Sequence, residues 1–444
     1  MKKYINISSF ALTFTFIYLL INYLIVSGTY SSYTNISLFI RLFLFVLLPF
    51  FLLFFFQIEK VKFFKPNFFI IIFLIFSYLN TKRVNSDYFW LSIPDARTYK
   101  TLGLEFLKCF QLTLQCNSEP YLLFPPFQPL LSGLLAKYLY EYAFLVNILF
   151  IAIVILLVNK ITENYFGVFS GIGLSYILIH SLIYELSPMM ISEITFTLLI
   201  FLSFYFLLKN TDKFLIINIT YMISLITRPI GIVLLPMYLY FIKNKLKFMI
   251  YLFLFIFVIC SYNFFYNDNF LFSDTEVNAR EDAILENQGY FDYFTKIIFS
   301  SYDEKVEILT YFSENLKRLY GESSKACVFT EICNVYNPIN NFDGTQSAFF
   351  INSNSGNYIS KFLTVIYQLQ APQNFGILIL PTTLILSLIL FRNKKLIIFP
   401  IAIVSLIFPS ILTTEFGSRW NFTILFLTGA IIEFIFCSYL NKKR

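Results

Sequence analysis

The chain has 444 residues, of which 58% are apolar, 20% aromatic and only 13% charged. Soluble domains carry about 25% charged residues, so a mean hydropathy of +0.70 over this length predicts a polytopic membrane protein. The net charge of +7 does not indicate nucleic-acid binding, because no folded basic domain carries it. A single histidine excludes a multi-histidine metal site.

Twelve hydrophobic segments follow one another along the chain, which predicts an all-α fold of about twelve transmembrane helices. A full crossing needs about 20 residues, so we expect the shorter segments to be tilted, broken or longer than their apolar cores. The segments lie near residues 5–26, 35–56, 66–80, 143–160, 166–184, 191–208, 213–227, 230–243, 247–264, 374–391, 396–412 and 420–438.

Basic clusters set the orientation of these segments, because short cytoplasmic loops are enriched in lysine and arginine. With twelve crossings, seven clusters fall on one side, and we assign that side and both chain ends to the cytoplasm of a multi-pass cell-membrane protein. The clusters are Lys2/Lys3, Lys60/Lys62/Lys65, Lys160, Lys209/Lys213, Lys243/Lys245/Lys247, Arg392/Lys394/Lys395 and Lys442/Lys443/Arg444.

Two regions that are too long to be simple turns then face outward. The loop 81–142 includes the apolar segment 126–141, whose prolines and charges predict a helix lying at the membrane interface. Region 265–373 carries seven basic and 14 acidic residues, a net charge of −7, and predicts a small extracytoplasmic domain. It separates an N-terminal transmembrane catalytic region, 1–264, from the C-terminal helices of 374–444.

The six cysteines divide into two kinds. Cys260 and Cys437 lie in or at the end of apolar segments, which is typical of small inert hydrophobes. The other four form two close pairs in outward loops, where disulfides and free thiols both remain open: Cys109/Cys116 and Cys327/Cys333.

The first candidate site residues follow the third hydrophobic segment, in the stretch "IPDARTYKTLGLEF" of residues 93–106. Asp95 and Tyr99 are four residues apart and therefore share one helix face, whereas Arg97 lies on another. We expect an interfacial helix that presents a carboxylate to a cavity at the outer mouth of the bundle. The alternative is an ordinary polar loop whose charges are solvated.

Other charged candidates lie at the same predicted side of the membrane. Glu193 opens a segment from its outer end, where it would stabilise the helix dipole or serve a rim site. Arg228 lies at an outer junction broken by Pro229, and Arg419 lies in the last outward loop. A guanidinium there would bind a phosphate bidentately or reach lipid head groups.

The order and common side of these motifs resemble the GT-C glycosyltransferases, closest to the protein O-mannosyltransferase-like and lipid A aminoarabinose transferase groups. The resemblance covers roughly 90–245, with a weaker match at 413–425. Ala96 stands where the family frequently has a second acid, and Phe124 stands where it has a lysine. The matching motifs are "PDARTYKTLG" with Asp95 and Tyr99, "FPPFQPLLSGL" with Pro125 and Pro126, "LSPMMISEITF" with Ser187, Pro188 and Glu193, Arg228-Pro229-Ile230-Gly231, and Arg419-Trp420.

The resemblance implies transfer of a sugar from a polyprenyl-phosphate donor to a lipid, glycan or protein acceptor on the extracytoplasmic face of the cell envelope. Asp95 and Glu193 would be catalytic, and Arg97, Tyr99, Arg228 and Arg419 would bind substrate. No metal ligand and no firm cofactor is assigned, and participation of a divalent cation is left open. A lipid or oligosaccharide transporter or flippase is the main alternative, and a non-catalytic membrane scaffold is another.

Overall fold

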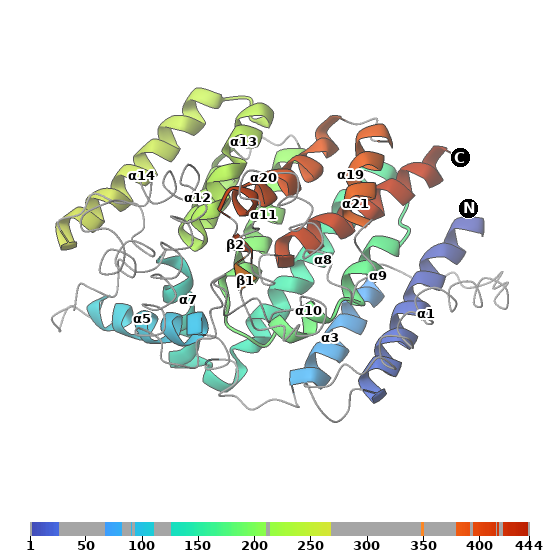
Figure 1. Ribbon diagram of the computed structural model, residues 1–444, viewed down its shortest axis with the longest axis horizontal. Helices are drawn as coiled ribbons and strands as arrows, with labels where there is room; N and C mark the ends of the chain where they lie inside the picture. The colour runs from blue at the N-terminus through green and yellow to red at the C-terminus, as the bar shows by residue number, and fades with distance from the viewer. Residues whose placement is uncertain are drawn as a thin grey trace.

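The computed structural model describes residues 2–25, 67–81, 90, 94–110, 126–209, 214–267, 348–349, 379–390, 394–413, 415–416 and 421–442 (Figure 1). Apart from one pair of two-residue strands, every regular element in these ranges is a helix. The all-α class predicted from the sequence is therefore confirmed for the described residues.

The helices vary widely in length along the chain, from single turns to elements of more than twenty residues. In chain order they are α1 (Lys2–Ile25), α3 (Asn67–Thr81), α5 (Pro94–Phe110), α7 (Phe127–Tyr138), η1 (Tyr140–Tyr142), α8 (Phe144–Phe166), α9 (Ile172–Leu178), α10 (Ser181–Leu186), α11 (Ser192–Leu208), α12 (Phe214–Thr227), η2 (Pro229–Leu234), α13 (Leu235–Phe241), α14 (Lys245–Asn267), α19 (Ile379–Leu390), η5 (Lys394–Ile397), α20 (Ile398–Thr413) and α21 (Asn421–Lys442).

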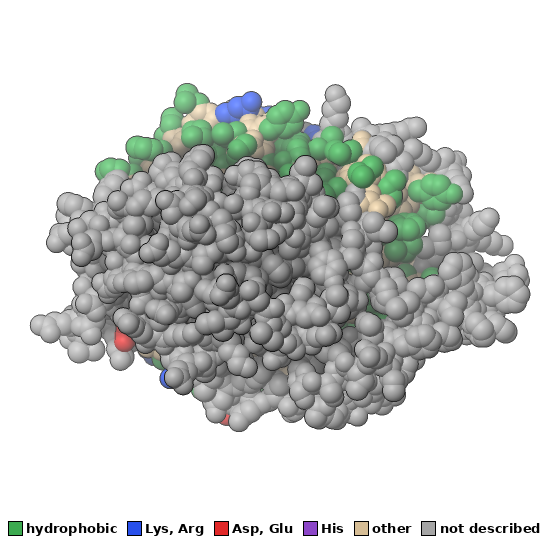
Figure 2. Space-filling model, viewed as in Figure 1, with side chains coloured by type: hydrophobic (Ala, Val, Ile, Leu, Met, Phe, Trp, Pro, Cys, Tyr) green, Lys and Arg blue, Asp and Glu red, His purple; other side chains and the backbone are tan. Residues whose placement is uncertain are grey.

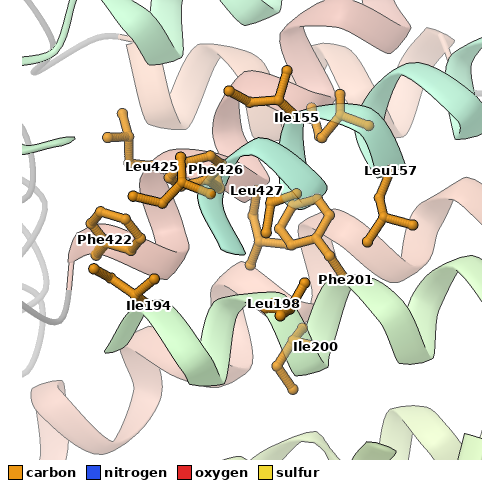
Figure 3. Packing of buried hydrophobic residues seen from close by; sticks show 14 of the residues in the cluster. Ile155, Leu157, Ile194, Leu198, Ile200, Phe201, Phe422, Leu425, Phe426 and Leu427 are labelled. Atoms are coloured by element: carbon orange, nitrogen blue, oxygen red, sulfur yellow. The ribbon is translucent and has the colours of Figure 1, made fainter. Parts of the chain in front are cut away.

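Helix α11 is the centre of the bundle. Every residue of 192–201 is buried, which is the pattern of a helix that is apolar around its whole circumference. It packs against α8, α12 and α21. Figure 3 shows side chains of α8, α11 and α21 meeting, among them Phe201 and Phe426, whose ring centroids lie 6.5 Å apart in an edge-on arrangement.

A buried carboxylate joins the last helix to the middle of the bundle. Glu433 of α21 is fully buried, and its oxygens accept hydrogen bonds from the backbone N–H groups of Ser170, Gly171 and Gly173 at 2.7–2.9 Å. These N–H groups lie at the start of α9, where an anion is favoured by the helix dipole. Cys437 donates to the same carboxylate at 3.3 Å.

Peripheral helices expose apolar side chains instead of burying them. On α14, Leu246 is 76%, Phe253 66% and Val258 62% exposed. Figure 2 shows hydrophobic side chains gathered along the edge that α13 and α14 occupy in Figure 1, with a patch of basic side chains among them. Contiguous exposed apolar surface of this kind is typical of contact with a membrane or another protein.

Two helical stretches of the described chain are long and apolar enough to cross a membrane, Tyr140–Phe166 and Phe422–Asn441. Shorter apolar helices accompany them, among them Ser192–Leu208 and Phe214–Thr227. Together with the exposed apolar faces, these helices indicate association with a membrane.

The ends of the described chain lie on one side of the bundle, and α5 and α7 lie on the other (Figure 1).

The helices differ from the predicted segments at two places. The segment predicted over 166–184 is divided into α9 and α10, and the one predicted over 230–243 begins as the tight helix η2. Prolines mark the second difference, because Pro229 begins η2 and Pro236 lies in the first turn of α13, and neither residue has a backbone N–H to donate. The segment predicted over 35–56 lies outside the described residues.

Two segments that lie far apart in the chain meet in the strand pair. Strand β1 (Ala348–Phe349) pairs antiparallel with β2 (Glu415–Phe416), so that Ala348 lies opposite Phe416. Of the domain predicted over 265–373, residues 265–267 belong to the end of α14 and residues 348–349 form β1; the rest, including Cys327 and Cys333, lies outside the described residues. Cys260 and Cys437 are buried free thiols, as their apolar surroundings predicted.

Candidate functional site

An ion pair between two central helices is the core of the candidate site. Glu193 lies in the first turn of α11 and is 3% exposed. Arg228 lies between α12 and η2, and its Nη1 is 2.6 Å from Glu193 Oε1. The structure therefore brings together two residues that are 35 positions apart and that the sequence placed at one end of the bundle.

Local sequence explains why these two side chains are in position. The residue before a proline is disfavoured in the α-helical region, and Arg228, which precedes Pro229, is extended with φ −147° and ψ 113°. Helix α12 consequently ends at Thr227, and the arginine leaves the helix axis. At α11 the acidic residue occupies the first turn, where the dipole favours negative charge.

Burial makes each charge depend on the other. The side chains of Arg228 and Glu193 are 16% and 5% exposed, so both have lost most of their contact with solvent. Breaking such a buried pair by removing one partner costs about 3–5 kcal/mol, because the remaining charge is left uncompensated. Of the two side chains, that of Arg228 retains the larger residual exposure.

A short chain of hydroxyl groups continues from the ion pair to α5. Ser192 Oγ lies 3.5 Å from Glu193 Oε2, and Tyr99 Oη lies 3.4 Å from Ser192 Oγ. Both distances are at the long end for hydrogen bonds between oxygen atoms, which are usually 2.5–3.0 Å. Tyr99 is 6% exposed, so this polar chain is enclosed by the protein.

Helix α5 is held in place by a close glycine contact with α7. A Cβ atom at Gly103 would collide with the carbonyl oxygen of Pro129 and the nitrogen of Gly133. A Cβ atom at Gly133 would collide in turn with the backbone of Gly103. Helices α5 and α7 therefore touch backbone to backbone, which fixes the position of Tyr99 one turn earlier.

A cation and two aromatic rings fix the same helix from another side. Lys100 Nζ donates to Tyr140 Oη at 3.1 Å and lies 4.5 Å from the centroid of that ring. Trp90 is fully buried and donates from Nε1 to the carbonyl oxygen of Tyr140 at 3.2 Å. Cation–π contacts contribute about 0.5–2 kcal/mol, depending on their burial, so this cluster attaches α5 to η1, which precedes α8.

The structure describes the other predicted site residues to different extents. Asp95 belongs to α5 one turn before Tyr99, so its position lies on the same helix face; its side chain lies outside the described part of the structure. Arg97 is exposed on another face of α5. Arg419 lies outside the described residues.

A contact between two threonines brings the start of α21 close to Glu193. Thr197 Oγ1 donates to the carbonyl oxygen of Glu193 at 2.7 Å and lies 2.8 Å from Thr423 Oγ1. Four residues of chain span at most about 14 Å, which limits the separation of Arg419 from Thr423.

In the described ranges, no group of three or more histidine, cysteine, aspartate or glutamate residues could hold a metal ion.

Sequence reasoning missed several residues that build this site. Ser192 adjoins Glu193, and a serine at the first position of a helix was the available signal. Trp90 is one of two tryptophans in the chain, and its position shortly before α5 was a second signal. The pairing of Gly103 with Gly133 had no signal in the sequence, because it depends on how α5 and α7 cross.

Comparison of the chain with protein family models, with curated protein sequences and with solved structures finds no match in any of the three. Interpretation of the site therefore depends on its own chemistry, which is a buried carboxylate–guanidinium pair linked through hydroxyl groups to an amphipathic helix.

Proposed function

We propose that the protein is a multi-pass membrane glycosyltransferase that moves a sugar from a polyprenyl-phosphate donor to an acceptor on the extracytoplasmic face. The observation that carries this proposal is the ion pair of Glu193 and Arg228, joined through Ser192 and Tyr99 to the helix of Asp95. All of these residues except Ser192 are ones that the glycosyltransferase resemblance selects, and an enzyme of this class needs both a carboxylate and a phosphate-binding cation.

The proposed membrane arrangement has about twelve crossings, cytoplasmic chain ends and an outward-facing site. The exposed apolar faces of α3 and α14 suit contact with lipid. The chain ends lie opposite α5 and α7, which agrees with a loop 81–142 on the outer side (Figure 1). A site at the outer ends of α11 and α12 would be reached by a donor that enters sideways from the outer leaflet.

In the proposed reaction, Asp95 acts as general base on an acceptor hydroxyl. The acceptor oxygen forms a bond to the anomeric carbon, the bond from that carbon to the phosphate oxygen breaks, and the acceptor proton passes to the carboxylate. The products are the glycosylated acceptor and polyprenyl phosphate. A single displacement of this kind inverts the anomeric centre.

Arg228 and Arg419 would stabilise the negative charge that develops on the departing phosphate. Glu193 would orient the acceptor or hold a divalent cation. The contact of Glu193 with Arg228 supports a role for both in one site, because a change at either side chain changes the electrostatic environment of the other.

Substitution of the proposed base tests this function. We expect Asp95→Asn to lower transfer from a lipid-phosphate-linked sugar by about 10²–10⁴-fold, because the acceptor proton loses its base. The matched control is Glu105→Gln, a partly exposed carboxylate on the same helix, which should retain activity. Membrane insertion is checked for both proteins, and an Asp95→Asn rate within a few-fold of the wild type would exclude the general-base role.

The arginine is tested separately with Arg228→Ala. We expect a loss of about 10²-fold in transfer together with weaker use of the donor, because the phosphate loses its cation. An unchanged donor dependence and rate would remove Arg228 from the site. Movement of a lipid-linked glycan across the membrane without any sugar transfer would instead support the transporter alternative.

A further inference from the structure

We infer that Glu193 is the resident counter-ion of Arg228, which the donor phosphate displaces, and that Ser192 is a positioning residue that receives the displaced carboxylate. This inference rests on the proposed function and specifies how that site would exchange its charges. It starts from the 2.6 Å contact between Arg228 Nη1 and Glu193 Oε1.

Charge balance is the first step. Glu193 and Arg228 together are neutral, and their side chains are only 5% and 16% exposed. A phosphate that bound the guanidinium beside the carboxylate would place two anions in contact at a poorly solvated site, which is costly. A phosphate that replaces the carboxylate on the guanidinium avoids an immediate contact between two anions, so binding and displacement occur together.

The displaced carboxylate then needs hydrogen-bond donors. Ser192 Oγ is 3.5 Å from Glu193 Oε2, and Tyr99 Oη is 3.4 Å from Ser192 Oγ. These contacts are long while Glu193 Oε1 is held by Arg228, and hydrogen bonds to a charged carboxylate shorten and strengthen when the geometry permits. A small rotation of the Glu193 side chain therefore replaces its contact with Arg228 by a hydrogen bond from Ser192, inside the protein.

The exchange also gives α5 a part in donor binding. Tyr99 lies on α5, one turn after Asp95, and the helix is fixed by Gly103 and Lys100. A carboxylate that moves toward Ser192 and Tyr99 moves toward the helix that carries the proposed base. Occupation of Arg228 by phosphate would in this way adjust the acceptor side of the site.

Binding of farnesyl phosphate to the purified full chain in detergent tests the exchange, with farnesol as the uncharged comparison. We expect Glu193→Gln to bind farnesyl phosphate about tenfold more tightly than the wild type, because the competing anion is gone. Ser192→Ala should bind it several-fold more weakly, and Ser192→Thr should restore the wild-type affinity, since its hydroxyl is retained. Binding of farnesol should be the same in all four proteins.

The outcomes distinguish a failure of the proposed donor class from a failure of the exchange at Glu193. If the wild type binds farnesyl phosphate no better than farnesol, the proposed donor class fails. If it binds farnesyl phosphate preferentially and neither Glu193→Gln nor Ser192→Ala changes the affinity, the donor class stands and the exchange is overturned. If Glu193→Gln does not fold, Ser192→Ala decides alone, because it preserves the ion pair; an unchanged affinity in that variant overturns the inference.

Discussion

At the residue scale, two buried carboxylates of this protein have different kinds of partner. One carboxylate oxygen of Glu193 contacts the side-chain guanidinium of Arg228, and the other lies near the hydroxyl of Ser192. Glu433 is instead saturated by fixed backbone donors from Ser170, Gly171 and Gly173. Geometry thus distinguishes a carboxylate suited to exchange from one that holds two helices together.

The role of Glu433 gives a stability prediction. Glu433→Gln replaces one acceptor oxygen by an amide group that faces a backbone donor, and hydrogen bonds to charged groups contribute about 1.5–3 kcal/mol each. We expect the free energy of unfolding to fall by about 2–3 kcal/mol, measured by thermal or denaturant unfolding in detergent.

Glu163→Gln is the matched control for Glu433. Glu163 pairs with Lys160 on the helix surface, and its side chain is 42% exposed. Exposed pairs of this kind contribute about 0–1 kcal/mol, so the control should unfold almost as the wild type does. Equal losses in the two variants would show that Glu433 does not fasten α21 to α9.

At the element scale, helices α5 and α7 pack together as one support for the site. Their backbones meet at Gly103 and Gly133, while Lys100 attaches α5 to Tyr140. Close helix packing of this kind depends on small residues, which permit backbones to approach. The orientation of Tyr99 toward Ser192 is a consequence of that crossing.

A single methyl group tests the crossing of α5 and α7. Alanine is favoured over glycine within a helix by about 1 kcal/mol, but overpacking against backbone atoms costs typically about 1–3 kcal/mol or more. We expect the collision to outweigh the helical preference, so Gly103→Ala should lower both the unfolding midpoint and sugar transfer.

Thr101→Ala is the control for this helix, because Thr101 is exposed on α5 and lies away from the contact with α7. It should leave the unfolding midpoint and the transfer rate close to the wild-type values. A Gly103→Ala protein that is more stable than the wild type, with full activity, would contradict the tight crossing.

At the scale of the whole molecule, the proposed topology assigns the basic loops to the cytoplasm and region 265–373 to the outside. We expect a label at Asn352 to react with a membrane-impermeant reagent in intact cells. A label at Lys160 should react only after the membrane is opened, because the positive clusters remain on the cytoplasmic side. Reaction of both positions from the same side would contradict the arrangement of crossings.

Most of the helical framework could be predicted from hydrophobic segments, because a buried or lipid-facing helix has to be apolar over most of its length. The predicted helix over 126–141 appears as α7, and the segments near 191–208 and 213–227 appear as α11 and α12. The division of 166–184 into α9 and α10 was not predictable in this way, because only His180 and Ser181 interrupt an otherwise apolar run at the break.

The sequence by itself determined the helical class, the apolar character of the segments and the placement of acids and arginines at their ends. These properties follow from local chemistry, since hydropathy, proline restrictions and helix dipoles act within a few residues. The tertiary structure alone decided that Glu193 meets Arg228, that Tyr99 reaches Ser192 and that Glu433 caps a helix about 260 positions earlier. Such contacts depend on the rotation and crossing of packed helices, which no local pattern specifies.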